Sequence, residues 1–283
     1  MPGGRRVAAV AGQFYEEESV ALTHQIEDCF RSERGPGELP TRHRSAERHI
    51  RALVVPHAGY VYSGPIAALA YAAVAAERPP RSVLILGVDH HGSGVPAAVS
   101  DQAWMPPLGP AAVDPDLVRA LARGPIEIDE ASHGPEHSLE VQVPFLQYVL
   151  PKPRFAGLMV RYGPISFLKE VAEVVRIAIA GRDLLLIAST DFSHYVPPED
   201  SKKLDHLAIE AILDRDADRL YKTVAEHDIS MCGIAPTTVL LAALAEEPLS
   251  CRLLRWGHSG ESERMARVVG YASLLLESKA PLG

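Results

Sequence analysis

The chain is short of cysteine and of long apolar segments, and each shortage excludes a class of protein. Only Cys29, Cys232 and Cys251 occur among 283 residues, and no C-x-x-C pair is present. An odd number of widely spaced cysteines argues against a disulfide framework and favours a reducing, cytoplasmic location. No apolar run approaches the roughly 20 residues that span a bilayer, so we expect no membrane association.

Positive charge is also in deficit. The 28 Lys and Arg residues are outnumbered by 36 Asp and Glu residues, which leaves a formal net charge of −8. This balance excludes the basic surface that nucleic-acid binding requires. Hydrophobic residues make up 47% of the chain, enough for a full core. With no internal repeat and no low-complexity linker, we expect residues 1–283 to form a single domain.

One segment differs from the rest. Residues 31–49 are charged, contain glycine and proline, and have few apolar side chains. We expect a flexible surface loop there, with its basic side chains in solvent.

The remaining apolar segments alternate between two kinds. Four are short and continuously apolar, which is typical of strands buried on both faces of a sheet. Alanine-rich or amphipathic stretches lie among them and predict helices, one of which is expected to begin at Pro65. This order predicts an α/β fold with a mainly parallel sheet flanked by helices. The expected strands are 50–57, 82–91, 155–163 and 183–194, with two later strands at 251–260 and 267–277, and the expected helices are 65–77, 165–181, 205–216 and 235–247.

Side chains that can bind metals gather at the ends of these strands. The first strand ends at His57, and the second ends in Asp89, His90 and His91. The fourth ends in "STDFSHY", which contains Asp191 and His194. Because the carboxyl ends of parallel strands lie at one edge of a sheet, these residues are expected to converge there.

Two connections supply further candidates. "GPEHSLEVQ" contains Glu136 and His137, and "SMCGIAP" places Cys232 just before an expected helix. A helix N-terminus favours the thiolate form of a nearby cysteine. Two imidazoles with a thiolate or carboxylate suit a borderline first-row metal.

Each residue taken alone also has a structural interpretation. Asp89 and Asp191 could serve in turns, Cys232 could be a small buried apolar residue, and Glu136 could be an exposed acid at a helix start. The joint pattern favours a site, because several polar side chains buried together without partners would be costly.

Several motifs, in this order, resemble those of the Memo-like family, whose bacterial and archaeal members are called AmmeMemoRadiSam system protein B. The similarity extends from about residue 11 to residue 276. The matching stretches are "AGQFYEEE", "VVPHAGYVYSGPIAA", "LILGVDHHGSG", "EHSLEVQVPFLQ", "ASTDFSHY", "MCGIAP" and "HSG" followed by "VVGYASLLL".

The resemblance implies a fold and a set of site residues. The family is similar in fold to class III extradiol dioxygenases, which are non-haem iron enzymes. His57, His90 and Cys232 match the family's metal-ligand positions. Asp191, His194 and His137 match motif positions around the metal. Where the family pattern has a small residue before the two histidines, this chain has Asp89, which is therefore a further candidate ligand.

The leading hypothesis is an iron-dependent, dioxygenase-like oxidoreductase that acts on an unknown small-molecule substrate. Iron(II) is the favoured metal, with copper or zinc as alternatives. His194 or His137 would act as general base, and Asp191 would orient an imidazole. A thiolate is unexpected, because extradiol enzymes use two histidines and a carboxylate.

Two alternatives stay open. The family includes members described as adaptors for phosphorylated peptides and as copper or iron binders, so a non-catalytic metal- or peptide-binding role is the main alternative. A metal-dependent hydrolase of the "DHH" type ranks lower, because residues 50–88 contain no aspartate. The family name implies two partners, an AMMECR1-type domain protein and a radical SAM protein.

Overall fold

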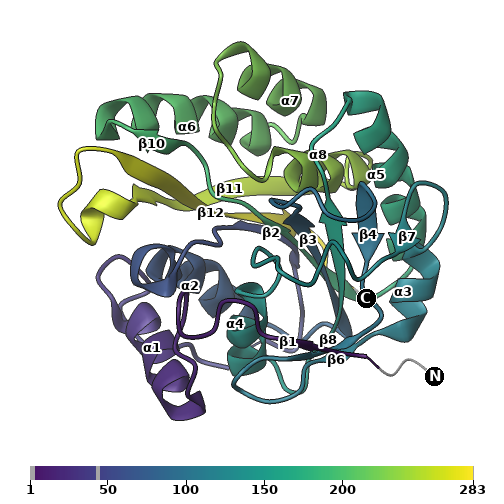
Figure 1. Cartoon of the computed structure of the whole chain (residues 1–283), viewed down its shortest axis with the longest axis horizontal. Coiled ribbons are helices and arrows are strands. Elements are labelled where there is room, and N and C mark those ends of the chain that lie inside the picture. The colour runs from purple at the N-terminus through teal and green to yellow at the C-terminus, as the bar shows by residue number, and fades with distance from the viewer. Residues whose placement is uncertain (1–3, 43–44, 283) are drawn as a thin grey trace.

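A large sheet runs through the centre of the molecule, with helices on both of its faces (Figure 1). The computed structural model describes residues 4–42 and 45–282. The helices are α1 (Ser19–Arg31), α2 (Tyr60–Ala76), α3 (Pro115–Leu121), α4 (Gln142–Val149), α5 (Ile165–Ile179), α6 (Pro198–Leu213), α7 (Ala217–Glu226) and α8 (Ile234–Ala243), with a 3₁₀ turn at Ser259–Glu261.

The central strands confirm the predicted fold class. Strands β2, β9, β3 and β8 are parallel neighbours in that order, and nearly all of their residues are buried. The two late strands, β11 and β12, extend the sheet in antiparallel fashion beside β2. The main strands are β2 (Ile50–Val55), β3 (Ser82–Val88), β8 (Arg154–Val160), β9 (Leu184–Ser189), β11 (Leu249–His258) and β12 (Val268–Ser278).

Short strands complete the architecture. Their lengths of two or three residues leave too little periodic pattern for sequence reasoning to detect. They are β1 (Arg5–Val7), β4 (Ala97–Val99), β5 (Ala103–Met105), β6 (Ala112–Val113), β7 (Glu127–Ile128) and β10 (His194–Val196), of which β1 and β5 form a separate two-stranded sheet.

Each face of the sheet has its own apolar core. Helices α1, α2 and α4 cover one face, and α3 with α5–α8 cover the other (Figure 1). Strand side chains alternate between the two cores, so that Leu53 belongs to one and Val54 to the other. This double burial explains why the strands are continuously apolar in sequence.

Helix α2 begins five residues earlier than predicted. Pro65 lies inside the helix rather than at its first position. Proline lacks the N–H that would bind the carbonyl of Val61. That carbonyl instead accepts hydrogen bonds from Arg34 Nη2 and Ser262 Oγ, each at 3.1 Å, so the interruption of the helix ladder is compensated.

The described part of segment 31–49 is mostly irregular, and some of its side chains bind other parts of the molecule. Its first residue belongs to α1, and residues 43–44 lie outside the described residues. Arg34 binds the carbonyls of Val61 and Tyr62. The interpretation of all its basic side chains as solvated is wrong for Arg48, which is 2% exposed and ion-paired with Asp183. The flexibility of the segment stays a prediction.

Among the described residues, no helix combines the length and apolar character needed to cross a membrane.

Candidate metal centre

Three donor atoms converge at the carboxyl edge of the parallel strands. His57 follows β2 by two residues, His90 follows β3 by two residues, and Cys232 lies just before α8. Their ligand atoms all lie within 4.8 Å of one another. Side chains separated by up to 175 residues in sequence are thus gathered at one point.

The surroundings of His57 select the form of the ring that binds metals. The hydroxyl of Ser189 donates to the carbonyl of Ser138 at 2.6 Å, so its oxygen accepts from His57 Nδ1 at 3.0 Å. The proton is therefore on Nδ1, and the Nε2 lone pair faces Cys232 Sγ at 3.2 Å. Burial lowers the pKa of His57 well below its usual value, and the nearby His137 and His90 lower it further. A neutral imidazole with a free Nε2 is the ligand form.

Glu136 selects the metal-binding form of the His90 ring in the same way. Its carboxylate accepts from His90 Nδ1 at 3.0 Å and from the His90 backbone N–H at 2.8 Å, which leaves Nε2 free. Burial acts to raise the pKa of Glu136, but its hydrogen bond to His90 and the nearby His90 and His137 hold that pKa well below the usual range. The interpretation of Glu136 as an exposed acid is wrong, because the residue is 1% exposed.

His137 lies behind His90 and creates a second possible set of ligands. The two rings are stacked with centroids 4.7 Å apart, and His137 Nδ1 is 3.3 Å from Glu136. His90, Glu136 and His137 also bring ligand atoms within 4.8 Å of one another. Burial lowers the pKa of His137 to about 4, so the ring is neutral near pH 7. His90 belongs to both sets of possible metal ligands.

Cys232 lies where predicted but in a different protonation state. The expectation that the helix N-terminus favours its thiolate is wrong, because burial of the thiol has the larger effect. Burial raises the pKa of Cys232, and the carboxylate of Asp191 raises it further. These effects outweigh the backbone N–H of Asp191, which donates to Sγ at 3.3 Å. A metal ion would therefore have to displace the thiol proton.

Asp191 and His194 lie beside the three donors rather than among them. Asp191 Oδ1 accepts from the His57 backbone N–H at 2.8 Å, and its Oδ2 is 4.0 Å from His57 Nε2. Burial raises the pKa of Asp191 to about 6. His194 begins β10 instead of ending β9, and its Nδ1 donates to the carbonyl of Ser230 at 2.8 Å. In the neutral ring this hydrogen bond places the lone pair on Nε2.

Comparison with known proteins identifies the family. The family model described as Memo-like protein matches residues 6–275. The chain belongs to the Memo-like family. It is 39% identical over 279 residues to a MEMO1 family protein of Methanopyrus kandleri, covering 95% of this chain and 98% of that protein. It is 38% identical over 276 residues to one of Methanothermobacter thermautotrophicus, covering 95% and 99%.

A solved structure supports the fold of this Memo-like chain. The crystal structure of an uncharacterized protein from Escherichia coli K12 superposes with a TM-score of 0.50 at 14% identity. The match covers 79% of this chain and 99% of that one. At this identity only the fold is shared, and the α/β architecture is consistent with the expected class III extradiol-dioxygenase-like fold.

A cavity of about 490 Å³ opens onto two of the three donors of this Memo-like chain, His57 and His90. His57, His90, His137, Asp191 and His194 all line it. Sequence reasoning missed the other walls, because their residues carry no motif for metal binding. These walls include Phe14, Tyr62, Met265, Arg267 and Tyr271.

Asp89 is engaged outside the donor cluster. Its Oδ2 accepts from Arg161 Nε at 2.8 Å, and its Oδ1 accepts from the backbone N–H of Gly92, also at 2.8 Å. Both carboxylate oxygens therefore hold the turn after β3, where Gly92 has a φ of 65°. Asp89 is not among the grouped ligand atoms of the described residues.

The variant Asp89→Asn tests whether this carboxylate stabilises the turn after β3 or binds the metal. We expect the variant to keep the metal content of the wild type, while its free energy of unfolding falls by about 1–2 kcal/mol, because the pair with Arg161 is lost. Elemental analysis and urea denaturation measure the two effects. Arg161→Gln is the matched control and should give the same pair of results. A loss of metal in Asp89→Asn alone would show that the carboxylate is a ligand.

Proposed function

We propose that this Memo-like protein binds iron(II) through His57, His90 and Cys232 and is a dioxygenase-like oxidoreductase acting on a small substrate. One observation carries the proposal: two imidazoles and a sulfur lie within 4.8 Å of one another beside an open cavity. Each imidazole has its Nδ1 engaged by a partner, which directs Nε2 toward the metal. This donor set fits a borderline first-row ion, so copper and zinc are the alternatives.

The chain's own residues would handle substrate protons. When bound, iron(II) supplies open coordination positions for a substrate oxygen and for O₂. His194 lines the same cavity, and in its neutral form the lone pair on Nε2 would take a proton from a substrate hydroxyl. Asp191, with a pKa raised to about 6, can hold a proton close to neutral pH. Phe14, Tyr62 and Tyr271 would exclude water around an apolar substrate.

The test of this proposal is purification without oxygen and without a metal-chelating tag, followed by elemental analysis. About one iron per chain, with O₂ uptake on addition of a member of a catechol-like panel, would support both parts. One metal per chain with no O₂ uptake across the panel would support binding without turnover. Protein that is purified without metal and then does not bind added Fe(II), Cu(I) or Zn(II) would contradict the proposed metal site.

Metal affinity is expected to depend on pH. Burial raises the pKa of Cys232, so each metal ion that binds must release a thiol proton. Protons therefore compete with the metal, and the apparent affinity for Zn(II) should fall by about tenfold per pH unit between pH 8 and pH 6. Competition titrations measure this slope, and Cys232→Ser should flatten it. An affinity that does not change with pH in the wild type would exclude thiolate ligation.

A non-catalytic binding role is the second candidate. It is favoured by Cys232, because a thiolate in place of a carboxylate departs from the facial triad of oxygen-activating iron enzymes. A sulfur ligand also suits copper(I), which needs no open position for O₂. Three widely spaced cysteines without a C-x-x-C pair fit a reducing cytoplasm as the location. The AMMECR1-type and radical SAM partners remain proposals that rest on family resemblance.

A further inference from the structure

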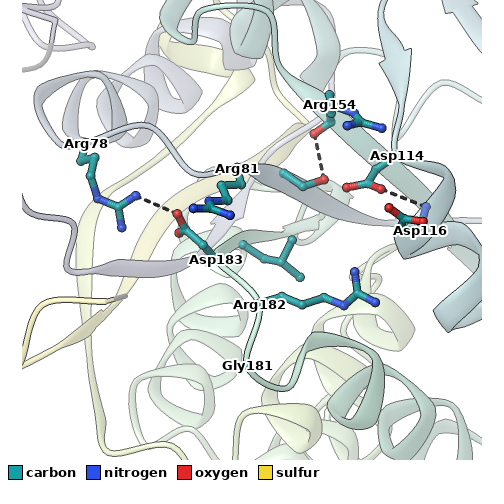
Figure 2. A pocket seen from close by; sticks show the side chains of 10 residues that line it. Arg78, Arg81, Asp114, Asp116, Arg154, Gly181, Arg182 and Asp183 are labelled. Carbon is teal, nitrogen blue, oxygen red and sulfur yellow. Dashed lines mark hydrogen bonds and ion pairs between the residues drawn. The ribbon is translucent and has the colours of Figure 1, made fainter.

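A second hollow lies at the opposite edge of the sheet. Its floor is formed where three parallel strands begin, at Ser82 of β3, Arg154 of β8 and Leu184 of β9. His57 and His90 of the metal centre follow the other ends of β2 and β3, so the two sites are separated by the length of these strands. Figure 2 shows the side chains that line this hollow. Its volume is about 700 Å³.

Each carboxylate that lines this hollow already has a hydrogen-bond or ion-pair partner within the protein. Four arginines and three aspartates line it. Burial acts to raise the pKa of Asp183, but two arginines outweigh burial and lower it, so this carboxylate is ionised and neutralised. The partners are the backbone N–H groups of Asp116 and Leu117 for Asp114, the guanidinium of Arg119 for Asp116, and the guanidinium groups of Arg48 and Arg78 for Asp183.

Three guanidinium groups at the hollow have no such partner. Arg81, Arg154 and Arg182 make no side-chain hydrogen bond or ion pair within residues 4–42 and 45–282. They come from three separate connections, before β3, at the start of β8 and before β9, and surround the hollow in Figure 2. Among the described residues of the lining, Asp114 is the one carboxylate without a cationic partner, so the three guanidinium groups still leave a local positive potential that favours an anion.

The backbone beneath these arginines is held together before any ligand arrives. The backbone N–H of Arg81 donates to the carbonyl of Asp183 at 3.2 Å. The hydroxyl of Ser82 donates to the carbonyl of Arg154, also at 3.2 Å. The three connections are therefore tied to one another, and binding would order side chains only, which lowers its entropic cost.

We propose that this hollow binds a small anion through a phosphate or diphosphate group. Arginine forks pair with phosphate oxygens through two parallel hydrogen bonds, and a tetrahedral group can be reached from several sides at once. Among the described residues, the lining has no aromatic side chain, and Leu184 is its one large apolar residue. A nucleotide base would find no stacking surface, so the phosphate group itself provides the recognition.

Calorimetric titration of the full chain with inorganic phosphate, diphosphate, ADP and citrate tests this assignment. We expect diphosphate to bind more tightly than phosphate, ADP to bind no more tightly than diphosphate, and citrate to bind more weakly. Arg154→Gln and Arg182→Gln should each weaken diphosphate binding by about tenfold. Their side chains are exposed, so the fold should tolerate both changes.

Two controls separate this hollow from other sources of binding. Arg5→Gln removes an exposed arginine that does not line the hollow and should leave the affinity unchanged. His57→Ala, measured in the presence of a chelator, should also bind diphosphate normally. Equal weakening in Arg5→Gln, loss of binding in His57→Ala, or the absence of diphosphate binding to the wild type would each overturn the proposal. ADP binding more than about tenfold tighter than diphosphate would overturn the assigned ligand class.

Discussion

Replacing Cys232 or His57 with alanine is expected to remove stoichiometric metal binding. Each variant loses one of the three donors of the proposed set, and the two that remain hold a metal only weakly. Metal retained in both variants would assign the site to His90, Glu136 and His137 instead. After anaerobic purification and dialysis, the metal content should fall from about one ion to below about 0.1 per chain. Elemental analysis measures the loss, and circular dichroism shows whether the fold is retained.

The chain offers a matched control for each ligand. Cys251 is also a free thiol, but it lies on β11. His91 is adjacent to His90 in sequence, but its side chain is exposed. Cys251→Ala and His91→Ala should retain the full metal content. If either control loses the metal as completely as the ligand variants, the assigned donor set is wrong.

Glu136→Gln should give an intermediate result. The amide can still accept a hydrogen bond from His90 Nδ1, but it no longer carries the negative charge that makes the ring a stronger donor. A loss of about 10–100-fold in metal affinity is typical for such an outer partner. If Glu136→Gln instead removes the metal completely, Glu136 is itself a ligand in the set with His90 and His137.

Arg6→Met is expected to destabilise the protein by about 3–5 kcal/mol, because it leaves a buried carboxylate without its counter-charge. Arg6 Nη1 donates to Glu140 at 2.6 Å, and both side chains are at most 4% exposed. The same guanidinium donates to the carbonyl of His133 at 2.8 Å and to the carbonyl of Glu136. The free energy of unfolding in urea measures the effect.

A double-mutant cycle with Glu140→Gln separates the charge pair from general packing. Glu140 also accepts from the hydroxyl of Tyr15 and from two backbone N–H groups, so its removal should be costly as well. The double variant should be more stable than the sum of the single losses predicts, because neither charge is then left alone. A loss below about 1 kcal/mol in Arg6→Met would show that the pair is not effectively buried.

The same contact links the N-terminal strand to the metal centre. Arg6 holds the segment that carries Glu136 and His137, so it positions groups that it does not touch through their side chains. Sequence reasoning had no means of finding this role. The partners Arg6 and Glu140 are 134 residues apart, and an arginine pair near the start of a chain is typically solvated.

Other differences between sequence and structure have similar physical causes. The protonation of Cys232 was misjudged because the position before a helix is visible in sequence, whereas desolvation depends on everything packed around the thiol. Glu136 was interpreted as exposed for the same reason. Pro65 was taken as the start of a helix because the arginine and serine that compensate for its missing N–H are distant in sequence.

The sequence by itself determined the α/β class, the parallel central strands and the edge at which His57, His90 and Asp191 meet. Short continuous apolar runs are typical of strands buried on both faces, and parallel strands place their carboxyl ends together. The tertiary structure alone decided the protonation of the donors, the burial of Glu136, the engagement of Asp89 with Arg161 and the arginine-lined hollow at the far edge. These properties depend on local dielectric and on pairings between distant segments, and neither has a signature in the order of the residues.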